Sequence, residues 1–134
     1  YQCAFLLFWA PGSEHNPTHP GDDEKATAIL EQTSGLPIFP IATTHLSELI
    51  AGLSLCDRII CSDGGALHIG AALGKPMICF FGHPEASRWY PWAVPHEVLQ
   101  KDSLEVSDIT VDETLAACDR LTRMIVSTGE EETG

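Results

Sequence analysis

Basic residues are scarce in this sequence. Its 134 residues include seven Lys and Arg but 19 Asp and Glu, which gives a formal net charge of −12 at pH 7. A general nucleic-acid surface needs many Lys and Arg side chains to displace the counterions of the phosphate backbone. The composition therefore argues against nucleic acid as a partner. Any phosphate site has to be local and rest mainly on backbone donors.

Long apolar runs and paired cysteines are missing too. No run approaches the roughly 20 residues that a membrane-spanning helix needs, and the run over 5–9 lacks the length and basic flank of a signal peptide. The five cysteines form no C-x-x-C pair. Because Cys3, Cys61 and Cys79 lie in or beside apolar runs, we expect buried free thiols in a reducing, cytoplasmic compartment.

The apolar content, at 44%, is enough for one domain with a core. We expect this domain to span residues 1–128. An acidic, disordered tail is expected over 129–134, where Glu130, Glu131 and Glu132 follow one another.

Strand-like and helix-like segments alternate along the chain. The patterns predict strands over 4–9, 38–41, 58–62, 77–81 and 97–100, and helices from about 22 to 35, over 46–55, over 65–73 and over 111–126. The first strand is apolar throughout, which is typical of burial on both faces. This order predicts an α/β fold with a doubly wound parallel sheet. Ligands then bind at the carboxyl ends of the strands, beside loops 11–21, 63–65 and 82–92.

The stretch 59–76 is the most informative part of the sequence. An apolar strand leads into Asp63, two glycines follow at Gly64 and Gly65, and a helix of small residues carries His68 one turn in. The first N–H groups of a helix have no partner within it, and the helix dipole adds partial positive charge there. The turn therefore predicts a seat for a phosphorylated ligand.

Further motifs surround this turn: L-x-E-L over 46–49, A-A-L-G-K-P over 71–76 and F-F-G over 80–82, with Arg88 and Trp89 beyond. Together with D-G-G-A-L-H over 63–68, this arrangement resembles glycosyltransferase family 9, the ADP-heptose:lipopolysaccharide heptosyltransferases and their relatives. The resemblance covers about residues 5–121. It implies the Rossmann-like C-terminal half of a GT-B glycosyltransferase, the half that binds the nucleotide sugar.

The resemblance also implies that parts of the protein lie outside this sequence. The family has an N-terminal acceptor-binding domain that carries its proposed catalytic carboxylate, and its nucleotide domain begins with a strand that sits mid-sheet. Without them we expect no catalytic residue in this fragment and a central gap in the sheet. Exposed strand edges would favour association, so we expect that the chain can form a homodimer.

The resemblance assigns contacts with the nucleotide-diphosphate sugar, an ADP-heptose-like donor, to Asp63, Gly64, Gly65, Ala66 and His68. It implies transfer without a required metal or cofactor. The family usually has Ser or Thr at position 64, so Gly64 loses a hydroxyl contact with phosphate. The structural alternatives are a helix N-cap for Asp63, a plain tight turn for the glycines and a structural imidazole for His68.

Two other segments are candidates for ligand contact. Ser13 and Glu14 lie in the loop over 11–21, which borders the nucleotide in this interpretation, and one acid of 14–24 holds the ribose. The alternative is a metal site formed by the acids and histidines of this loop: Glu14, His15, His19, Asp22 and Asp23. Pro17 and Pro20 prevent these residues from lying on a single face of a helix. The aromatic segment 88–92 is either a lid on the last helix or a surface that faces the missing domain or the sugar. Lys75 is expected to be a helix C-terminal charge and not a ligand.

The predicted function is an inverting transfer of a heptose-like sugar to lipopolysaccharide or a related glycan. The site of action is the cytoplasm, with contact of the full protein at the inner membrane surface. This chain alone is expected to bind nucleotide weakly and to catalyse nothing. The alternative is a non-catalytic nucleotide-binding or interaction domain that retains the fold, and Gly64 is its best support.

Overall fold

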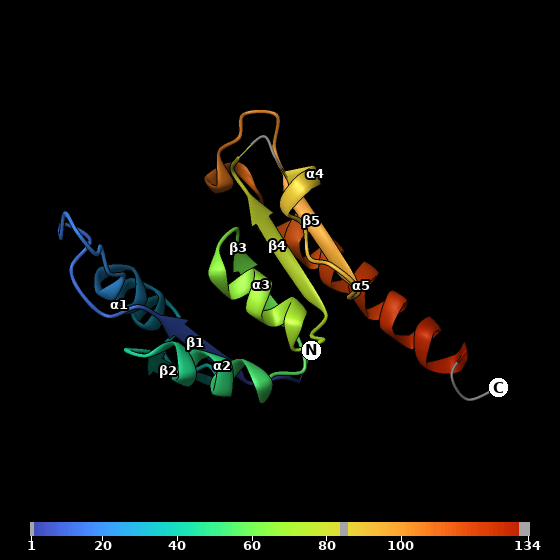
Figure 1. Ribbon diagram of the computed structural model, residues 1–134, viewed down its shortest axis with the longest axis horizontal. Coiled ribbons are helices and arrows are strands. Elements are labelled where there is room, and N and C mark those ends of the chain that lie inside the picture. Colours follow the sequence, from blue (N-terminus) through green and yellow to red (C-terminus); the bar gives the residue numbers. More distant parts are fainter. Residues whose placement is uncertain (1, 84–85, 132–134) are drawn as a thin grey trace. The chain divides into compact units, whose positions relative to one another are not determined.

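The computed structural model describes residues 2–83 and 86–131. Strands and helices alternate as the sequence predicts, and Figure 1 shows their order. Two short elements, α4 and η1, were not expected, because single turns leave little periodicity in a sequence. The elements are β1 (Phe5–Trp9), α1 (Asp23–Gln32), β2 (Ile38–Ala42), α2 (Leu46–Ser54), β3 (Ile59–Ser62), α3 (Gly65–Ala72), β4 (Met77–Phe81), α4 (Ala86–Trp89), β5 (His96–Gln100), the 3-10 turn η1 (Val106–Asp108) and α5 (Val111–Glu131).

The strands pair in parallel, which confirms the α/β class. They lie in two sheets and not in one continuous sheet, and the family resemblance led us to expect a gap. One sheet is β1-β2 and the other is β3-β4-β5. Within residues 2–83 and 86–131, β1 pairs only with β2 and β3 pairs only with β4, so each has one unpaired edge. The chain divides correspondingly into two compact units, 1–52 and 53–134, and each is described by itself.

In the first unit, β1 and β2 pair from Phe5 opposite Ile38 to Trp9 opposite Ala42. A side chain at Gly52 would collide with the ring of Phe8, so the end of this unit approaches β1 closely. The expectation that β1 is buried on both faces is wrong: Phe5 is 48% exposed and the rest of the strand is half-buried. Because β1 pairs only with β2, its other edge has no neighbouring strand, and this adds to its exposure.

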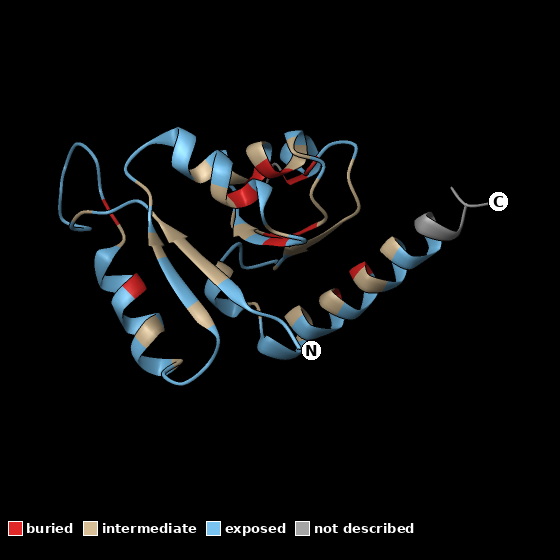
Figure 2. Cartoon of the chain, turned by 90° about the horizontal axis from the view of Figure 1, so that it is seen from below, coloured by how far each residue is buried: buried red, intermediate tan, exposed pale blue. Residues whose placement is uncertain are grey.

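In the second unit, helices cover both faces of the sheet. A side chain at Gly70 of α3 would meet Met77 and Ile59, so α3 packs tightly on the face to which these two contribute. On the opposite face Ile78 packs with Ala117 and Leu121 of α5. Ala117 and Leu121 are four residues apart and therefore lie on one face of α5, a helix that is otherwise mostly half-buried or exposed (Figure 2). This three-layer unit carries most of the core.

Helix α5 is longer than predicted. It continues to Glu131, whereas the sequence predicts an end near Val126 and a disordered tail from 129. Glu is a good helix former and each residue added to an existing helix gains one hydrogen bond, which explains the extension. The tail residues 132–134 lie outside the described residues. Within the described part, every helix is too short or too polar to cross a membrane.

The five cysteines are free thiols, but only some are buried. Cys79 is buried and Cys61 is partly buried, whereas Cys3 is exposed because it precedes β1 and no element covers it. Cys61 and Cys79 are register partners on β3 and β4. The hydrogen bond between the two thiols lowers the pKa of Cys61 and raises that of Cys79, which stays neutral.

Candidate functional site

The predicted ligand turn lies at the carboxyl end of β3. Asp63 extends the strand, since its N–H donates to the carbonyl of Phe80 at 2.9 Å. The N-cap of α3 is Gly64, with no side-chain cap, so the N-cap alternative for Asp63 is wrong. Gly64 has φ +152° and ψ −170°, a backbone conformation that is essentially restricted to glycine. The turn places the exposed Asp63 beside the start of α3 without using it as a cap.

The start of α3 offers backbone donors to solvent. Gly64 and Gly65 are exposed and Ala66 is partly exposed. A Cβ built at either glycine would have no neighbour within 4 Å, so a ligand could approach the backbone directly. First-turn N–H groups have no partner within their helix, and the dipole of α3 adds partial positive charge. Donors arranged in this way are able to hold an anion, and we refer to this turn as the anion seat.

His68 adds a side chain to this seat. It lies one turn into α3, is exposed, and contacts Trp89 of α4 edge-on with ring centroids 6.1 Å apart and planes inclined by 70°. The structure therefore brings together all five predicted residues of the second unit: Asp63, Gly64, Gly65, Ala66 and His68.

Most basic side chains are engaged in structural bonds away from this turn. Lys75 was expected to be a charge at the C-terminus of α3, but its ammonium donates instead to the carbonyl of Ser54, the last residue of α2, at 2.7 Å. Five of the seven Lys and Arg residues are bound in this way: Lys25 to Asp22, Arg58 to Thr122, Lys75 to Ser54, Lys101 to Glu113 and Arg120 to Glu97. These five side chains are therefore held in structural contacts.

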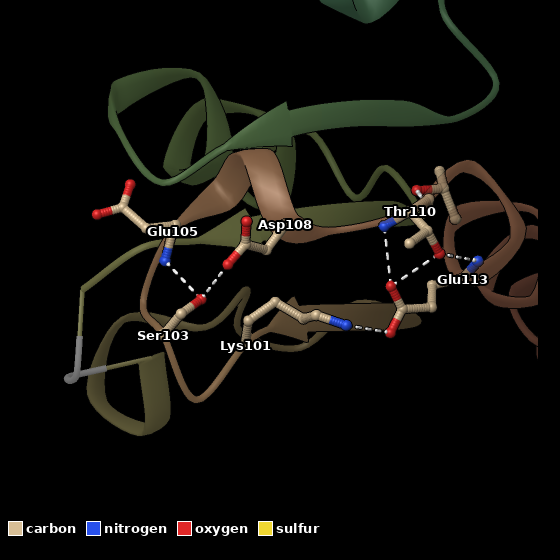
Figure 3. A network of polar contacts seen from close by, with 7 residues as sticks. Lys101, Ser103, Glu105, Asp108, Thr110 and Glu113 are labelled. Carbon is tan, nitrogen blue, oxygen red and sulfur yellow. Dashed lines mark hydrogen bonds and ion pairs between the residues drawn. The ribbon is translucent and has the colours of Figure 1, made fainter.

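Lys101 lies at the same strand-end edge but was missed by the sequence analysis. It follows the carboxyl end of β5, and its ammonium binds Glu113 Oε1 at 2.6 Å (Figure 3). Glu113 Oε2 accepts from the N–H and hydroxyl of Thr110 at 2.8 and 2.9 Å, and Thr110 Oγ1 accepts from the Glu113 N–H at 3.2 Å. This capping box starts α5. Lys101 and these donors lower the pKa of Glu113 to about 2.

The spacing Thr110-x-x-Glu113 could have predicted this box, because Thr followed by Glu three residues later is its sequence signature. The preceding loop is also ordered by side chains. Ser103 Oγ donates to Asp108 Oδ2 at 2.6 Å and accepts from the Glu105 N–H at 3.3 Å (Figure 3). The polar side chains that follow β5 therefore stabilise the connection to α5.

Ser13 and Glu14 belong to the first unit and are exposed. The carbonyl of Ser13 accepts from the N–H groups of Asn16 and Gly21, at 3.2 and 3.0 Å, which closes the loop. The N–H of Glu14 donates to Glu24 Oε2 at 3.3 Å. Hydrogen bonds from the backbone of Glu24 itself and of Glu14 lower the pKa of the Glu24 carboxyl. Both candidates thus have roles within their own loop.

The two aspartates that follow are engaged structurally as well. Asp22 pairs with Lys25 at 2.7 Å, and Asp23 accepts from the indole N–H of Trp9 and the N–H of Gly12. Within the part of the chain that the structure describes, no three His, Cys, Asp or Glu residues gather as metal ligands.

The aromatic segment after β4 is exposed. Trp92 is 81% exposed, Trp89 48% and Tyr90 43%, so none of the three rings is fully buried. Ala86 and Pro91 of the same stretch are buried. Residues 84–85 of the predicted loop lie outside the described residues.

Three comparisons with known proteins complete the description. A family model described as glycosyltransferase family 9 (heptosyltransferase) matches residues 1–114. The solved structure of a glycosyl transferase family 9 protein from Veillonella parvula DSM 2008 is similar to this chain, with 20% identity and a TM-score of 0.71. The match covers 88% of this chain but 36% of that one. Among curated proteins no match was found.

Proposed function

The chain belongs to glycosyltransferase family 9, and we propose that it is the nucleotide-sugar-binding part of an inverting glycosyltransferase. The donor is a nucleotide-diphosphate sugar of the ADP-heptose type, and the acceptor is lipopolysaccharide or a related glycan. The chain spans little more than a third of the length of the solved relative, so other segments supply the acceptor site. The full protein acts in the cytoplasm, at or near the inner membrane surface.

One observation carries this proposal: an open anion seat at the start of α3. The backbone donors of Gly64, Gly65 and Ala66 are accessible, with His68 one turn further along the same helix. A phosphorylated ligand on a chain with a net charge of −12 needs local donors of this kind.

The seat suits the leaving group of sugar transfer. An acceptor hydroxyl attacks the anomeric carbon, a base outside this chain removes its proton, and the bond to the diphosphate breaks with its electron pair on the phosphate oxygen. Donors fixed at the seat stabilise the charge that develops on that oxygen. His68 donates from its ring, and the carboxylate of Asp63, which can only accept, receives a hydrogen bond from a hydroxyl of the ligand.

We also propose that the unpaired edges of β1 and β3 each pair with a strand from outside residues 1–134. Unpaired edges are association-prone, and a second copy of the chain is the expected partner where that strand is lacking. Light scattering on the chain as it stands would report this dimer.

Calorimetric titration of ADP, UDP, GDP and an ADP-sugar into the chain tests the proposal. Asp63→Ala and His68→Ala are each expected to weaken binding of one diphosphate by roughly tenfold, the value of one charge-assisted hydrogen bond. Asp57→Ala is the control. Asp57 is also exposed, but it precedes β3 and therefore lies at the amino end of the strand, whereas Asp63 follows the carboxyl end. Equal effects of Asp63→Ala and Asp57→Ala would contradict the site.

A second candidate is a non-catalytic nucleotide-binding domain. Gly64 supports it, because this residue lacks the hydroxyl that the family usually places there. Sugar transfer by the full-length polypeptide separates the two. Transfer that depends on Asp63 supports the enzyme, whereas nucleotide binding without any transfer supports the second candidate. Transfer by this chain alone would overturn the assignment of the base to another domain.

A further inference from the structure

Two thiols lie side by side within the β3–β4 pair of the second unit. Cys61 and Cys79 are register partners on these parallel strands, and their thiols share a hydrogen bond. Cys79 is fully buried, whereas Cys61 is only partly buried. The sugar transfer proposed above uses neither thiol.

The spacing of the two strands allows these thiols to be joined. Neighbouring strands of a sheet lie about 4.8 Å apart, and register partners direct their side chains to the same face. A disulfide needs Cα atoms about 4.4–6.8 Å apart and Cβ atoms about 3.8 Å apart. The Cα spacing of register partners therefore already suits a disulfide, and the Cβ atoms have to approach each other by only about 1 Å.

The other three cysteines lie elsewhere. Cys118 of α5 packs against Ile78, and because Ile78 and Cys79 are adjacent in β4, Cys118 lies on the opposite face of the sheet from Cys79. Cys56 precedes β3, and Cys3 belongs to the first unit. All five cysteines are within the described residues, and the strand register pairs Cys61 with Cys79 alone.

The thiol pair lies beneath the start of α3. A side chain at Gly70 would meet Ile59 and Met77, so these two side chains are directed toward α3. Cys61 and Cys79 are two residues further along the same strands and point to the same face. That step is about 6.6 Å, the rise of about four helix residues, and α3 returns along β3 from the turn that joins them. The first turn of α3, which carries the anion seat, therefore lies over the two thiols.

We propose that Cys61 and Cys79 form a reversible disulfide, a redox-sensitive element beneath the anion seat. The oxidant is a small-molecule disulfide, R–S–S–R, of the glutathione type. Cys61 gives its proton to water and attacks one sulfur as the thiolate, which forms Cys61–S–S–R and releases R–S⁻. Cys79 then gives its proton to R–S⁻ and attacks the sulfur of Cys61, which releases the second R–S⁻ to be protonated from water. Two cysteine thiols are thus oxidised, and R–S–S–R is reduced to two R–SH.

Burial and the hydrogen bond between the thiols favour this order. Cys61 is the more accessible of the two, and the hydrogen bond from Cys79 lowers its pKa. The same hydrogen bond raises the pKa of Cys79. Once Cys61 is part of a mixed disulfide it carries no negative charge, so a major obstacle to ionisation of Cys79 is removed.

The bridge has to distort the sheet where the seat begins. The strands are held at their spacing by backbone hydrogen bonds, so drawing the Cβ atoms together stores strain, and strained disulfides are easily reduced. Asp63 follows Cys61 by two residues, and its N–H donates to the carbonyl of Phe80, the residue after Cys79. Oxidation should therefore weaken this hydrogen bond and displace the start of α3.

Peptide mapping of the chain, equilibrated with mixtures of oxidised and reduced glutathione, tests the thiol pair. We expect an intramolecular disulfide between Cys61 and Cys79 that forms as the share of oxidised glutathione rises and is lost with dithiothreitol. Cys79→Ala should trap glutathione on Cys61, whereas Cys61→Ala should leave the buried Cys79 unmodified. Cys118→Ala is the matched control, since it removes a thiol from the opposite face and should leave the disulfide unchanged.

The map of the wild-type chain decides the proposal even where a variant fails to fold. Absence of the Cys61–Cys79 disulfide at the highest share of oxidised glutathione, or uptake of glutathione at Cys79 before Cys61, overturns it. Neither measurement contains a nucleotide. Failure of the diphosphate titrations would therefore refute the proposed function and leave this inference standing.

Amide hydrogen exchange, followed by NMR in the reduced and the oxidised chain, tests the link to the seat. The Asp63 N–H should exchange about threefold faster or more after oxidation, because its bond to Phe80 is strained. The amide of Leu121 in α5, on the other side of the sheet, should not exchange faster. Unchanged or slower exchange at Asp63 in a fully oxidised chain would show that the bridge does not reach the turn, and the redox sensitivity of the seat would be refuted.

Discussion

The indole N–H of Trp9 donates a hydrogen bond of 2.8 Å to Oδ1 of Asp23, across the loop that separates β1 from α1. The second oxygen of Asp23 accepts from the N–H of Gly12 at 2.9 Å. One carboxylate at the start of α1 thus fixes both the end of β1 and the loop that carries Ser13 and Glu14. It also lies in the first turn of its helix, where the dipole favours a negative charge.

Asp23→Ala is therefore expected to destabilise the first unit by about 1–2 kcal/mol, because two hydrogen bonds to one charged group are lost at a solvent-exposed site. Urea unfolding followed by tryptophan fluorescence would measure this loss. The matched control is Asp22→Ala, which removes only an exposed pair with Lys25, a kind of contact worth little. Equal losses in the two variants would show that the contacts of Asp23 carry no particular weight.

Gly64 and Gly65 form a matched pair for separating backbone strain from steric room. A Cβ at either position would have open space, but only Gly64 has a positive φ. Gly64→Ala should destabilise the chain by about 1–3 kcal/mol. Gly65→Ala replaces glycine inside a helix and should stabilise the chain by up to about 1 kcal/mol. Thermal unfolding of both variants provides the comparison.

The same pair also tests the anion seat. Gly65→Ala should weaken binding of nucleotide diphosphate although the variant is more stable, since its methyl group occupies the space in front of the backbone donors. Gly64→Ser adds a hydroxyl but should not increase the affinity for nucleotide diphosphate, because serine cannot easily adopt φ +152°. A Gly64→Ser variant that is both stable and a tighter binder would refute this conformation of the turn.

Glu113 predicts a dependence of stability on pH. Lys101 and the donors of Thr110 lower its pKa in the folded chain from 4.5 to about 2. A depressed folded-state pKa means that the contribution is complete above the unfolded value and declines as pH falls from about 4.5 toward 2. Urea midpoints measured between pH 6 and 2.5 should fall, and the fall should be shallower in Glu113→Gln.

The control for this experiment is Asp112→Asn, an exposed acid of the same first turn that is outside the capping box. Its pH profile should follow the wild type. If Glu113→Gln and the wild type lose stability in parallel, the acid sensitivity comes from other carboxylates.

Local signals predicted most of the secondary structure. Apolar runs located β3 and β4, and Gly74 between them located the end of α3, because periodicity and turn chemistry are properties of adjacent residues. The seat from Asp63 to His68 was predicted for the same reason, since it lies within six consecutive residues.

Features that depend on distant contacts were harder to predict. The interruption of the sheet was expected only from the family resemblance, because no residue of β1 or β3 by itself encodes which strand edges find partners. The glycine-specific conformation of Gly64 and the contact of His68 with Trp89 likewise arise from packing between segments. The capping box at Thr110 is the exception, because its sequence signature was available.

The core of the second unit provides a last prediction. Leu121 of α5 is 1% exposed and packs with Ile78 and Ala117, whereas Leu115 on the same helix is 49% exposed. Leu121→Ala should destabilise the unit by about 2–5 kcal/mol, since it removes a buried side chain and leaves a cavity beside β4. Leu115→Ala should cost less than about 1 kcal/mol, because much of the side chain is already in water. Both changes are the same in chemistry and in helix propensity, so the difference between their urea midpoints isolates burial. Equal costs would mean that α5 does not pack on β4 through the stripe that contains Leu121, and the three-layer arrangement behind the anion seat would then be wrong.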